Sequence, residues 1–146
     1  MDEPSNFSFI DDFIAGSAIP QSKSNLEFYL QNDINNIVTL TSEKPLAFHY
    51  IEKLDFNLLH LSITNPPISK EMIASFVDFL SKAKKKNEKV VIHCQFGQER
   101  TGIMLVVYLI KIKGYNVKNA ISEVRTNRPG SLQMKSTLEF LLTNYN

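Results

Sequence analysis

A single cysteine, Cys94, lies six residues before Arg100 in the stretch V-V-I-H-C-Q-F-G-Q-E-R-T-G. A cysteine thiolate is a nucleophile, and a guanidinium can hold two oxygens of one phosphate group at once. The β-branched residues 90–93 predict a strand before the cysteine, and the apolar pattern of residues 101–113 predicts a helix after the arginine. The first N–H groups of a helix lack internal partners and lie at the positive end of its dipole. The order strand, loop, helix therefore predicts a nucleophile beneath a bound anion.

The loop between the cysteine and the helix contains one glycine and several polar side chains. We expect its backbone N–H groups to line a phosphate pocket, with Phe96 near the rim. The predicted substrate-binding residues are Gln95, Phe96, Gly97, Gln98, Glu99 and Arg100. Taken singly, a lone cysteine is more often a buried small hydrophobe and an arginine is usually a surface charge. Their order and spacing after a strand favour a catalytic loop.

The same stretch resembles a known signature. H-C-Q-F-G-Q-E-R-T-G is similar to the His-Cys, five residues, Arg-Thr/Ser-Gly pattern of cysteine-dependent protein tyrosine phosphatases. N-F-S-F-I-D-D-F-I-A-G-S-A-I-P, I-V-T-L-T and A-I-S-E-V-R-T-N-R-P-G-S resemble a compact atypical dual-specificity phosphatase. The resemblance implies that Cys94 forms a phosphocysteine and that Arg100 binds phosphate and stabilises the transition state. It also implies that Thr101 hydrogen-bonds the sulfur and assists breakdown of the intermediate.

The proton donor of this family is missing at its expected place. The family normally uses an aspartate on the loop before the long middle helix, but this chain has I-T-N-P-P there, with Asn65 at the matching position. An amide cannot act as a general acid.

Glu99 is a second departure, since many members have glycine at this position. A neighbouring phosphate would favour its protonated form, which could protonate the leaving group. Alternatively, the side chain turns outward and pairs with a lysine or arginine, and both interpretations stay open.

A third departure concerns the water that hydrolyses the intermediate. The family often has a glutamine in the last helix for this purpose, and Thr137 stands in its place here. Gln133 or Gln98 could substitute.

These residues predict a phosphatase of phosphate monoesters, whose partner is a phosphorylated protein or another such ester. A phenol leaves more readily than an alkyl alcohol, so phosphotyrosine should be favoured over phosphoserine and phosphothreonine. The alternatives are an RNA 5′-triphosphatase, a phosphoinositide phosphatase, or a catalytically weak phosphate-binding module.

The composition limits the other possibilities. With 146 residues, 43% of them hydrophobic, we expect one catalytic domain over residues 1–146. A net charge of +1 gives no reason to expect stable nucleic-acid binding. His49, His60 and His93 lack metal-ligand spacing, so we expect neither metal nor cofactor. The longest apolar run, residues 103–110, is too short to span a membrane, and the N-terminus lacks a signal-peptide pattern. One cysteine fits a reducing compartment, and we expect a cytoplasmic monomer.

The pattern along the chain alternates strands and helices, which predicts an α/β domain. Strands are expected on both sides of residues 11–12 and at 36–41, 57–63 and 90–93; helices are expected at 22–32, after Ser69, and at 101–113, 119–127 and 131–145. Residues 42–54 are interpreted as a variable loop that could hold an edge strand. The resemblance implies a single-domain protein tyrosine phosphatase-like fold. Its mixed, mostly parallel sheet of about five strands is flanked by helices, and the phosphate-binding loop joins a strand to a helix.

Overall fold

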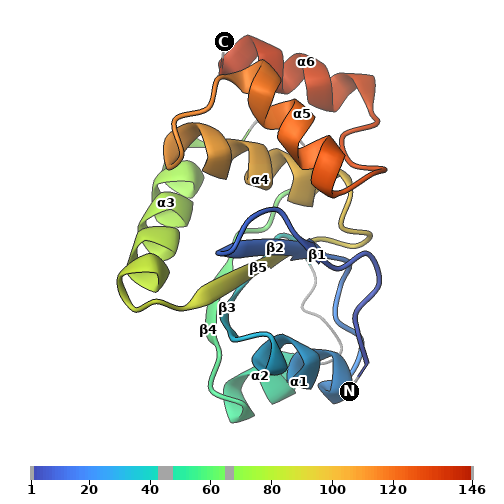
Figure 1. Cartoon of the computed structure of the whole chain (residues 1–146), viewed down its shortest axis with the longest axis vertical. Helices are drawn as coiled ribbons and strands as arrows, with labels where there is room; N and C mark the ends of the chain where they lie inside the picture. Colours follow the sequence, from blue (N-terminus) through green and yellow to red (C-terminus); the bar gives the residue numbers. More distant parts are fainter. Residues whose placement is uncertain (1, 43–47, 65–67, 146) are drawn as a thin grey trace.

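A computed structural model describes residues 2–42, 48–64 and 68–145. These residues form a five-stranded sheet with helices on both faces (Figure 1). The strands are β1 (Ser8–Phe9), β2 (Ile14–Ser17), β3 (Ile34–Thr39), β4 (Asn57–His60) and β5 (Lys89–His93). The helices are α1 (Lys23–Gln31), α2 (Phe48–Lys53), α3 (Lys70–Lys85), α4 (Glu99–Lys111), α5 (Val117–Asn127) and α6 (Lys135–Asn144).

The strand order is β1-β2-β5-β3-β4, and every pairing is parallel except that of β1 with β2. The predicted mixed, mostly parallel sheet is therefore confirmed. Strand β5 lies at its centre, and its residues Val90, Val91 and Ile92 are fully buried, as expected for a parallel strand covered on both faces. His93 pairs with Ser17 on one side and Thr39 on the other, so three strands end at the same edge of the sheet. Ligands of α/β proteins bind at this carboxyl edge.

Helices α1 and α2 cover one face of the sheet, and α3 and α4 cover the other, with α5 and α6 packed outside α4 (Figure 1). Helix α4 is consequently enclosed, and residues 101–109 are all buried. A helix surrounded in this way can be apolar on every side, which explains the run I-M-L-V-V-Y-L. Burial on both sides fixes the direction in which α4 leaves the loop after β5.

Two predicted helix starts are confirmed. The Ser22 hydroxyl accepts a hydrogen bond from the Asn25 amide at 3.2 Å, and the Ser69 hydroxyl accepts one from the Met72 amide at 3.1 Å. Each bond satisfies an N–H group that has no partner inside its own helix.

Residues 48–53 correct the prediction of a loop that could hold an edge strand. They form α2, whose Ile51 is 1% exposed in the core beneath the sheet. This helix is short and buries one side chain, so its sequence has no periodic apolar pattern from which a helix could be predicted. Residues 43–47 of the same predicted loop lie outside the described residues.

Several boundaries also differ from prediction. Helix α6 begins at Lys135 and not at residue 131, because Leu132 adopts a left-handed backbone conformation with φ of 58°. Helix α4 begins two residues earlier than predicted, at Glu99. Strand β4 ends at His60, three residues before the predicted end. Among the described residues, no helix is both long enough and apolar enough to cross a membrane.

Candidate active site

The predicted catalytic loop, residues 94–100, joins the end of β5 to the first turn of α4. Cys94 lies at its base and is 3% exposed, and the Gly97 amide donates to the Cys94 Sγ at 3.3 Å. Arg100 lies in the first turn of α4, where its Nη1 donates to the Ile63 carbonyl oxygen at 3.2 Å. The structure thus places the predicted nucleophile and the predicted phosphate ligand at the two ends of one short loop. We call residues 94–100 the phosphate loop.

The carbonyl oxygens of four consecutive loop residues accept hydrogen bonds from groups outside the loop. The His93 ring contacts the Cys94 oxygen at 3.3 Å, the Ile19 amide donates to Gln95, the Asn6 side chain donates to Phe96 and Gly97, and Arg128 also donates to Gly97. In a planar trans peptide, the N–H group points away from the preceding carbonyl. Holding these oxygens on the outside therefore turns the following amides toward the inside. Such a ring of inward amides is an anion-binding nest.

Gly97 is required by this arrangement. Its φ is +75°, a conformation that side chains with a Cβ rarely adopt. A Cβ at this position would also lie 2.6 Å from the carbonyl carbon and oxygen of Ser17. The loop therefore packs directly against the backbone at the end of β2, and no other residue fits there without displacement.

Arg128, at the C-terminus of α5, lies behind the phosphate loop and is only 1% exposed. Its guanidinium donates to the Gly97 carbonyl at 2.6 Å, the Gly16 carbonyl at 2.8 Å and the Ser8 hydroxyl at 3.0 Å. Burial lowers the pKa of Arg128 to about 10, while attraction to Cys94 opposes that shift. The guanidinium therefore stays charged at neutral pH and joins the loop to two strands.

Sequence reasoning missed Arg128 and Asn6 as residues of the site. Both residues lie in segments that resemble the family, Arg128 in A-I-S-E-V-R-T-N-R-P-G-S and Asn6 at the start of N-F-S-F-I-D-D-F-I-A-G-S-A-I-P, and that resemblance was an available signal. Nothing in the local sequence, however, relates Asn6 to a loop about ninety residues later.

His93 orients the start of the loop as a neutral ring. It is completely buried, and burial lowers its pKa to about 4. A carbonyl oxygen can only accept, so the contact of Nδ1 with the Cys94 oxygen places the proton on Nδ1. Nε2 then accepts from the Thr39 hydroxyl at 2.8 Å. The ring connects the loop to the neighbouring strand β3 without adding charge.

Thr101 follows Arg100 and is fully buried. Within the described residues its hydroxyl oxygen has no hydrogen-bond partner, so the predicted bond to the Cys94 sulfur is not formed in this structure. A buried hydroxyl without a hydrogen-bond partner costs free energy. Because the Thr101 hydroxyl makes no other hydrogen bond among the described residues, it is free to form one during the reaction. Its assistance to breakdown of the intermediate stays a prediction.

The Glu99 side chain turns away from the phosphate loop. Its Oε2 accepts from the Gln133 amide at 2.8 Å, and its Oε1 accepts from the Met134 amide at 3.1 Å. The outward orientation matches one of the two interpretations, but the partners are backbone amides and not the expected lysine or arginine. Both oxygens act as acceptors, so neither is placed to donate a proton to a substrate in this conformation. Asn65, where the family acid was expected, lies outside the described residues.

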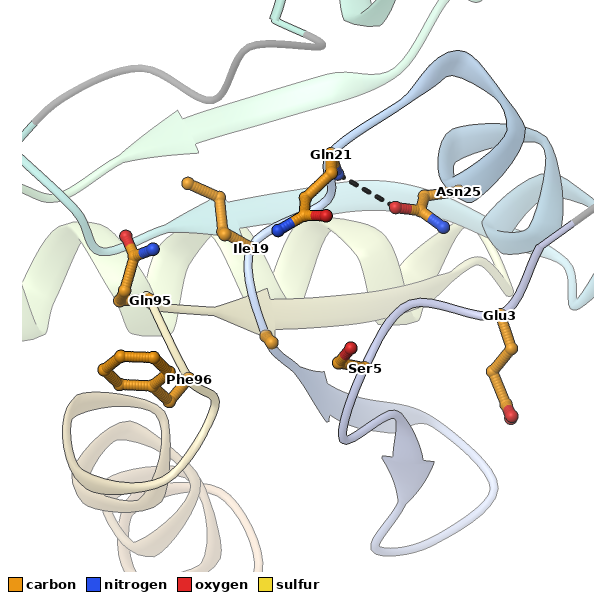
Figure 2. Close-up of a pocket in the computed structure, with 8 residues that line it drawn as sticks. Glu3, Ser5, Ile19, Gln21, Asn25, Gln95 and Phe96 are labelled. Carbon is orange, nitrogen blue, oxygen red and sulfur yellow. Dashed lines mark hydrogen bonds between the residues drawn. The ribbon is translucent and has the colours of Figure 1, made fainter.

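A cavity of about 340 Å³ lies beside the phosphate loop. Figure 2 shows Gln95 and Phe96 at one side and Glu3 and Ser5 of the N-terminal segment at the other. Phe96, which we expected near the rim of the phosphate pocket, is 70% exposed and lines this cavity. In the described part of the chain, no cluster of His, Cys, Asp and Glu side chains could hold a metal ion.

The five-stranded, mostly parallel sheet carries a cysteine-containing loop at its carboxyl edge. Comparison of the sequence with known families gives a match that agrees with this arrangement. Residues 17–146 match the family model of the dual specificity phosphatase catalytic domain. The chain therefore belongs to this family.

Two curated relatives are fungal. The chain is 27% identical over 133 residues to the tyrosine-protein phosphatase CDC14 of Candida albicans, covering 82% of this chain and 24% of the relative. It is 29% identical over 113 residues to the protein of the same name in Saccharomyces cerevisiae, covering 74% of this chain and 20% of the relative. The chain thus spans a quarter or less of the length of either protein.

Solved structures show the same fold. The active form of Tk-PTP superposes with a TM-score of 0.82 and 28% identity, over 94% of this chain and 95% of that one. PTPMT1 superposes with a TM-score of 0.81 and 22% identity, over 92% and 90% of the two chains.

Proposed function

We propose that this chain is a cysteine-dependent phosphatase that hydrolyses phosphate monoesters through a phosphocysteine at Cys94. The observation that carries the proposal is the phosphate loop, in which four consecutive carbonyls accept hydrogen bonds from groups outside the loop and the Gly97 amide donates to the Cys94 sulfur. Such a preorganised set of donors matches the charge of a phosphoryl group in transfer.

The proposed reaction has two steps. The substrate phosphate binds to the loop amides and to the Arg100 guanidinium, and the Cys94 thiolate attacks phosphorus. The phosphorus–sulfur bond forms while the bond to the leaving oxygen breaks, and that oxygen leaves as an anion or takes up a proton. Water then attacks phosphorus, the phosphorus–sulfur bond breaks, and inorganic phosphate and the thiolate are released.

The preferred substrates in this proposal are phosphorylated tyrosines. The Glu99 carboxylate accepts from the backbone amides of Gln133 and Met134, so it is not directed at a leaving group. A phenol, with a pKa of about 10, needs less help in leaving than the alcohol of serine or threonine. The fungal relatives are named tyrosine-protein phosphatases, which supports the same substrate.

A second candidate is an inositol phosphate. The Arabidopsis thaliana protein named inositol diphosphatase DSP3 is 28% identical over 132 residues, which covers 85% of this chain and 63% of the relative. This substrate class is therefore tested beside phosphopeptides.

The test compares purified protein on a phosphotyrosine peptide, the matched phosphothreonine peptide, an inositol diphosphate and triphosphate-ended RNA. We expect the highest kcat/KM for the phosphotyrosine peptide. Equal rates for the two peptides would contradict the proposed preference and indicate a strong acid. A preference for the inositol or RNA substrate would replace the proposed one. Orthovanadate binding without turnover of any substrate would indicate a phosphate-binding module.

A further inference from the structure

The segment before α6, residues 131–134, is fastened to the start of α4 and to α5. Leu132 is fully buried, and a Cβ at Gly102 of α4 would lie 2.7 Å from its Cδ2. The Arg125 guanidinium of α5 donates to the Leu132 carbonyl at 2.6 Å. The Glu99 carboxylate holds the next two amides. These contacts give the segment a defined position relative to the phosphate loop.

The Glu99 carboxylate contacts the backbone at the start of α6. The N-cap residue of α6 is Met134, which has no side-chain oxygen, and no side chain of its own segment caps this helix. Glu99 reaches across from α4 and accepts from the amides of Gln133 and Met134 at 2.8 and 3.1 Å. A carboxylate at the positive end of a helix makes charge-assisted hydrogen bonds, which are about twice as strong as neutral ones. Glu99 thus holds the two residues that immediately precede α6.

The same contact brings a second polar residue to the phosphate loop. Glu99 is itself the penultimate residue of that loop, so the backbone of Gln133 lies directly beside it. On the same side, the Gln98 Nε2 would lie 3.7 Å from a Cβ at Gly130. Residues 130–134 therefore run along the second half of the phosphate loop.

Gln133 has the chemistry needed to orient water. Its side chain is exposed, and its Nε2 donates to the Ser131 carbonyl at 3.2 Å. Within the described residues its Oε1 accepts no hydrogen bond, and an amide oxygen can accept a proton from water. Thr137, which stands at the position of the family glutamine, is 3% exposed and packs inside the protein. Of these two residues, Gln133 is the one that reaches solvent near the loop.

We infer that Glu99 is a positioning residue whose carboxylate holds Gln133 beside the phosphate loop, where the Gln133 amide oxygen orients the water that hydrolyses the phosphocysteine. This inference rests on the proposed two-step reaction. It explains why a carboxylate stands next to Arg100 without opposing a bound phosphate, since both Glu99 oxygens are directed at amides on the outside of the loop.

The inference and the alternative of a proton donor make opposite kinetic predictions. A proton donor acts while the leaving group departs, so its loss slows the first step, and more so for a poorer leaving group. A residue that positions water acts after the leaving group has gone. Its loss slows only the second step, by the same factor for every substrate.

The experiment is rapid mixing of the protein with p-nitrophenyl phosphate and with phenyl phosphate. The proteins are the unmodified chain, Glu99→Ala, Glu99→Gln and Gln133→Ala. Glu139→Gln is the matched control, because Glu139 is an exposed carboxylate on α6 whose partner is Lys135.

In Glu99→Ala and Gln133→Ala we expect an unchanged burst rate and one phenol released per Cys94. Steady turnover should then fall roughly tenfold to a hundredfold, the loss expected when a catalytic group is misplaced. Glu99→Gln keeps one acceptor oxygen and should lie between Glu99→Ala and the unmodified chain.

Three outcomes would overturn the inference. A slower burst in Glu99→Ala, with a larger deficit for phenyl phosphate, would make Glu99 the acid. Unchanged turnover in Gln133→Ala would remove Gln133 from the second step. Equal losses in both steps, together with weaker orthovanadate binding, would reduce the Glu99 contact to a support of the fold. If the unmodified protein releases no phenol at all, the proposed function fails first, so the two failures are distinguishable.

Discussion

The guanidinium of Arg128 donates a 2.6 Å hydrogen bond to the carbonyl oxygen of Gly97, from the side of the phosphate loop that faces the protein interior. Its other partners, Gly16 and Ser8, also offer uncharged oxygens. A buried cation without a carboxylate partner is costly, unless a negative charge is brought close to it. The position of Arg128 behind the loop means that a thiolate or a bound phosphate can supply that charge.

Replacement of Arg128 should therefore affect both stability and anion binding. Arg128→Met removes four hydrogen bonds to oxygens of Ser8, Gly16 and Gly97, so we expect the free energy of unfolding to fall by about 2–4 kcal/mol. Arg128→Lys keeps the charge but cannot bridge these four oxygens, and it should keep part of the stability. Urea unfolding measures the first effect, and orthovanadate inhibition measures the second.

The matched control for Arg128 is Lys118→Met, which removes an exposed cation from the same helix. It should change neither stability nor inhibition. Orthovanadate inhibition of Arg128→Met that equals the unmodified protein, measured where both are folded, would show that Arg128 plays no part in the loop.

Gly97 allows a clean separation of backbone strain from steric clash. Gly97 and Gly114 have nearly the same φ, +75° and +78°, but a Cβ at Gly114 would meet nothing within 4 Å. Gly114→Ala should cost only the left-handed conformation, about 1–2 kcal/mol, with full activity. Gly97→Ala adds a clash with the backbone of Ser17, so it should be less stable and should lose phosphatase activity. Equal thermal stability and equal kcat/KM in the two variants would contradict the close packing of the loop on β2.

His93 predicts a specific pH dependence of stability. Its pKa falls from 6.5 to about 4 on folding, because burial disfavours the charged ring. The unfolded chain therefore binds more protons between these values. Its contribution to stability is complete above pH 6.5 and is lost as the pH falls toward 4, with a total of about 3 kcal/mol.

The measurement is the free energy of unfolding from pH 7 to pH 4, compared between the unmodified protein and His93→Gln. The variant lacks the titrating ring, so its curve should be flatter over this range. His49→Gln changes an exposed ring and should leave the slope unchanged. Parallel curves for His93→Gln and the unmodified protein would mean that His93 is not the buried neutral ring seen here.

The parts of the site that are close in sequence could be predicted from the sequence. Cys94, Arg100 and the strand and helix that flank them lie within one continuous stretch, so order and spacing were sufficient. The helix starts at Ser22 and Ser69 could be predicted for the same reason, because the hydrogen bond that begins each helix joins residues only three positions apart. Sequence patterns of this kind predict contacts between residues that are close together in the chain.

The remaining contacts join residues that are distant in the chain, and no local pattern encodes them. Asn6 reaches a carbonyl 91 residues away, and Arg128 reaches one 31 residues away. The partners of Glu99 lie 34 and 35 residues later, which is why its orientation stayed open. Helix α2 was not predicted, because its sequence has no periodic apolar pattern. It is stabilised by the burial of Ile51 in the core, which is a contact with distant residues.

The central claim is that Cys94 accepts the phosphoryl group of the substrate. Acid quenching during turnover of a radiolabelled aryl phosphate, followed by peptide mapping, tests it directly. We expect label on the peptide that contains Cys94, and none in Cys94→Ser, which should still bind orthovanadate but should not turn over. Label on another residue, or continued turnover by Cys94→Ser, would contradict the claim.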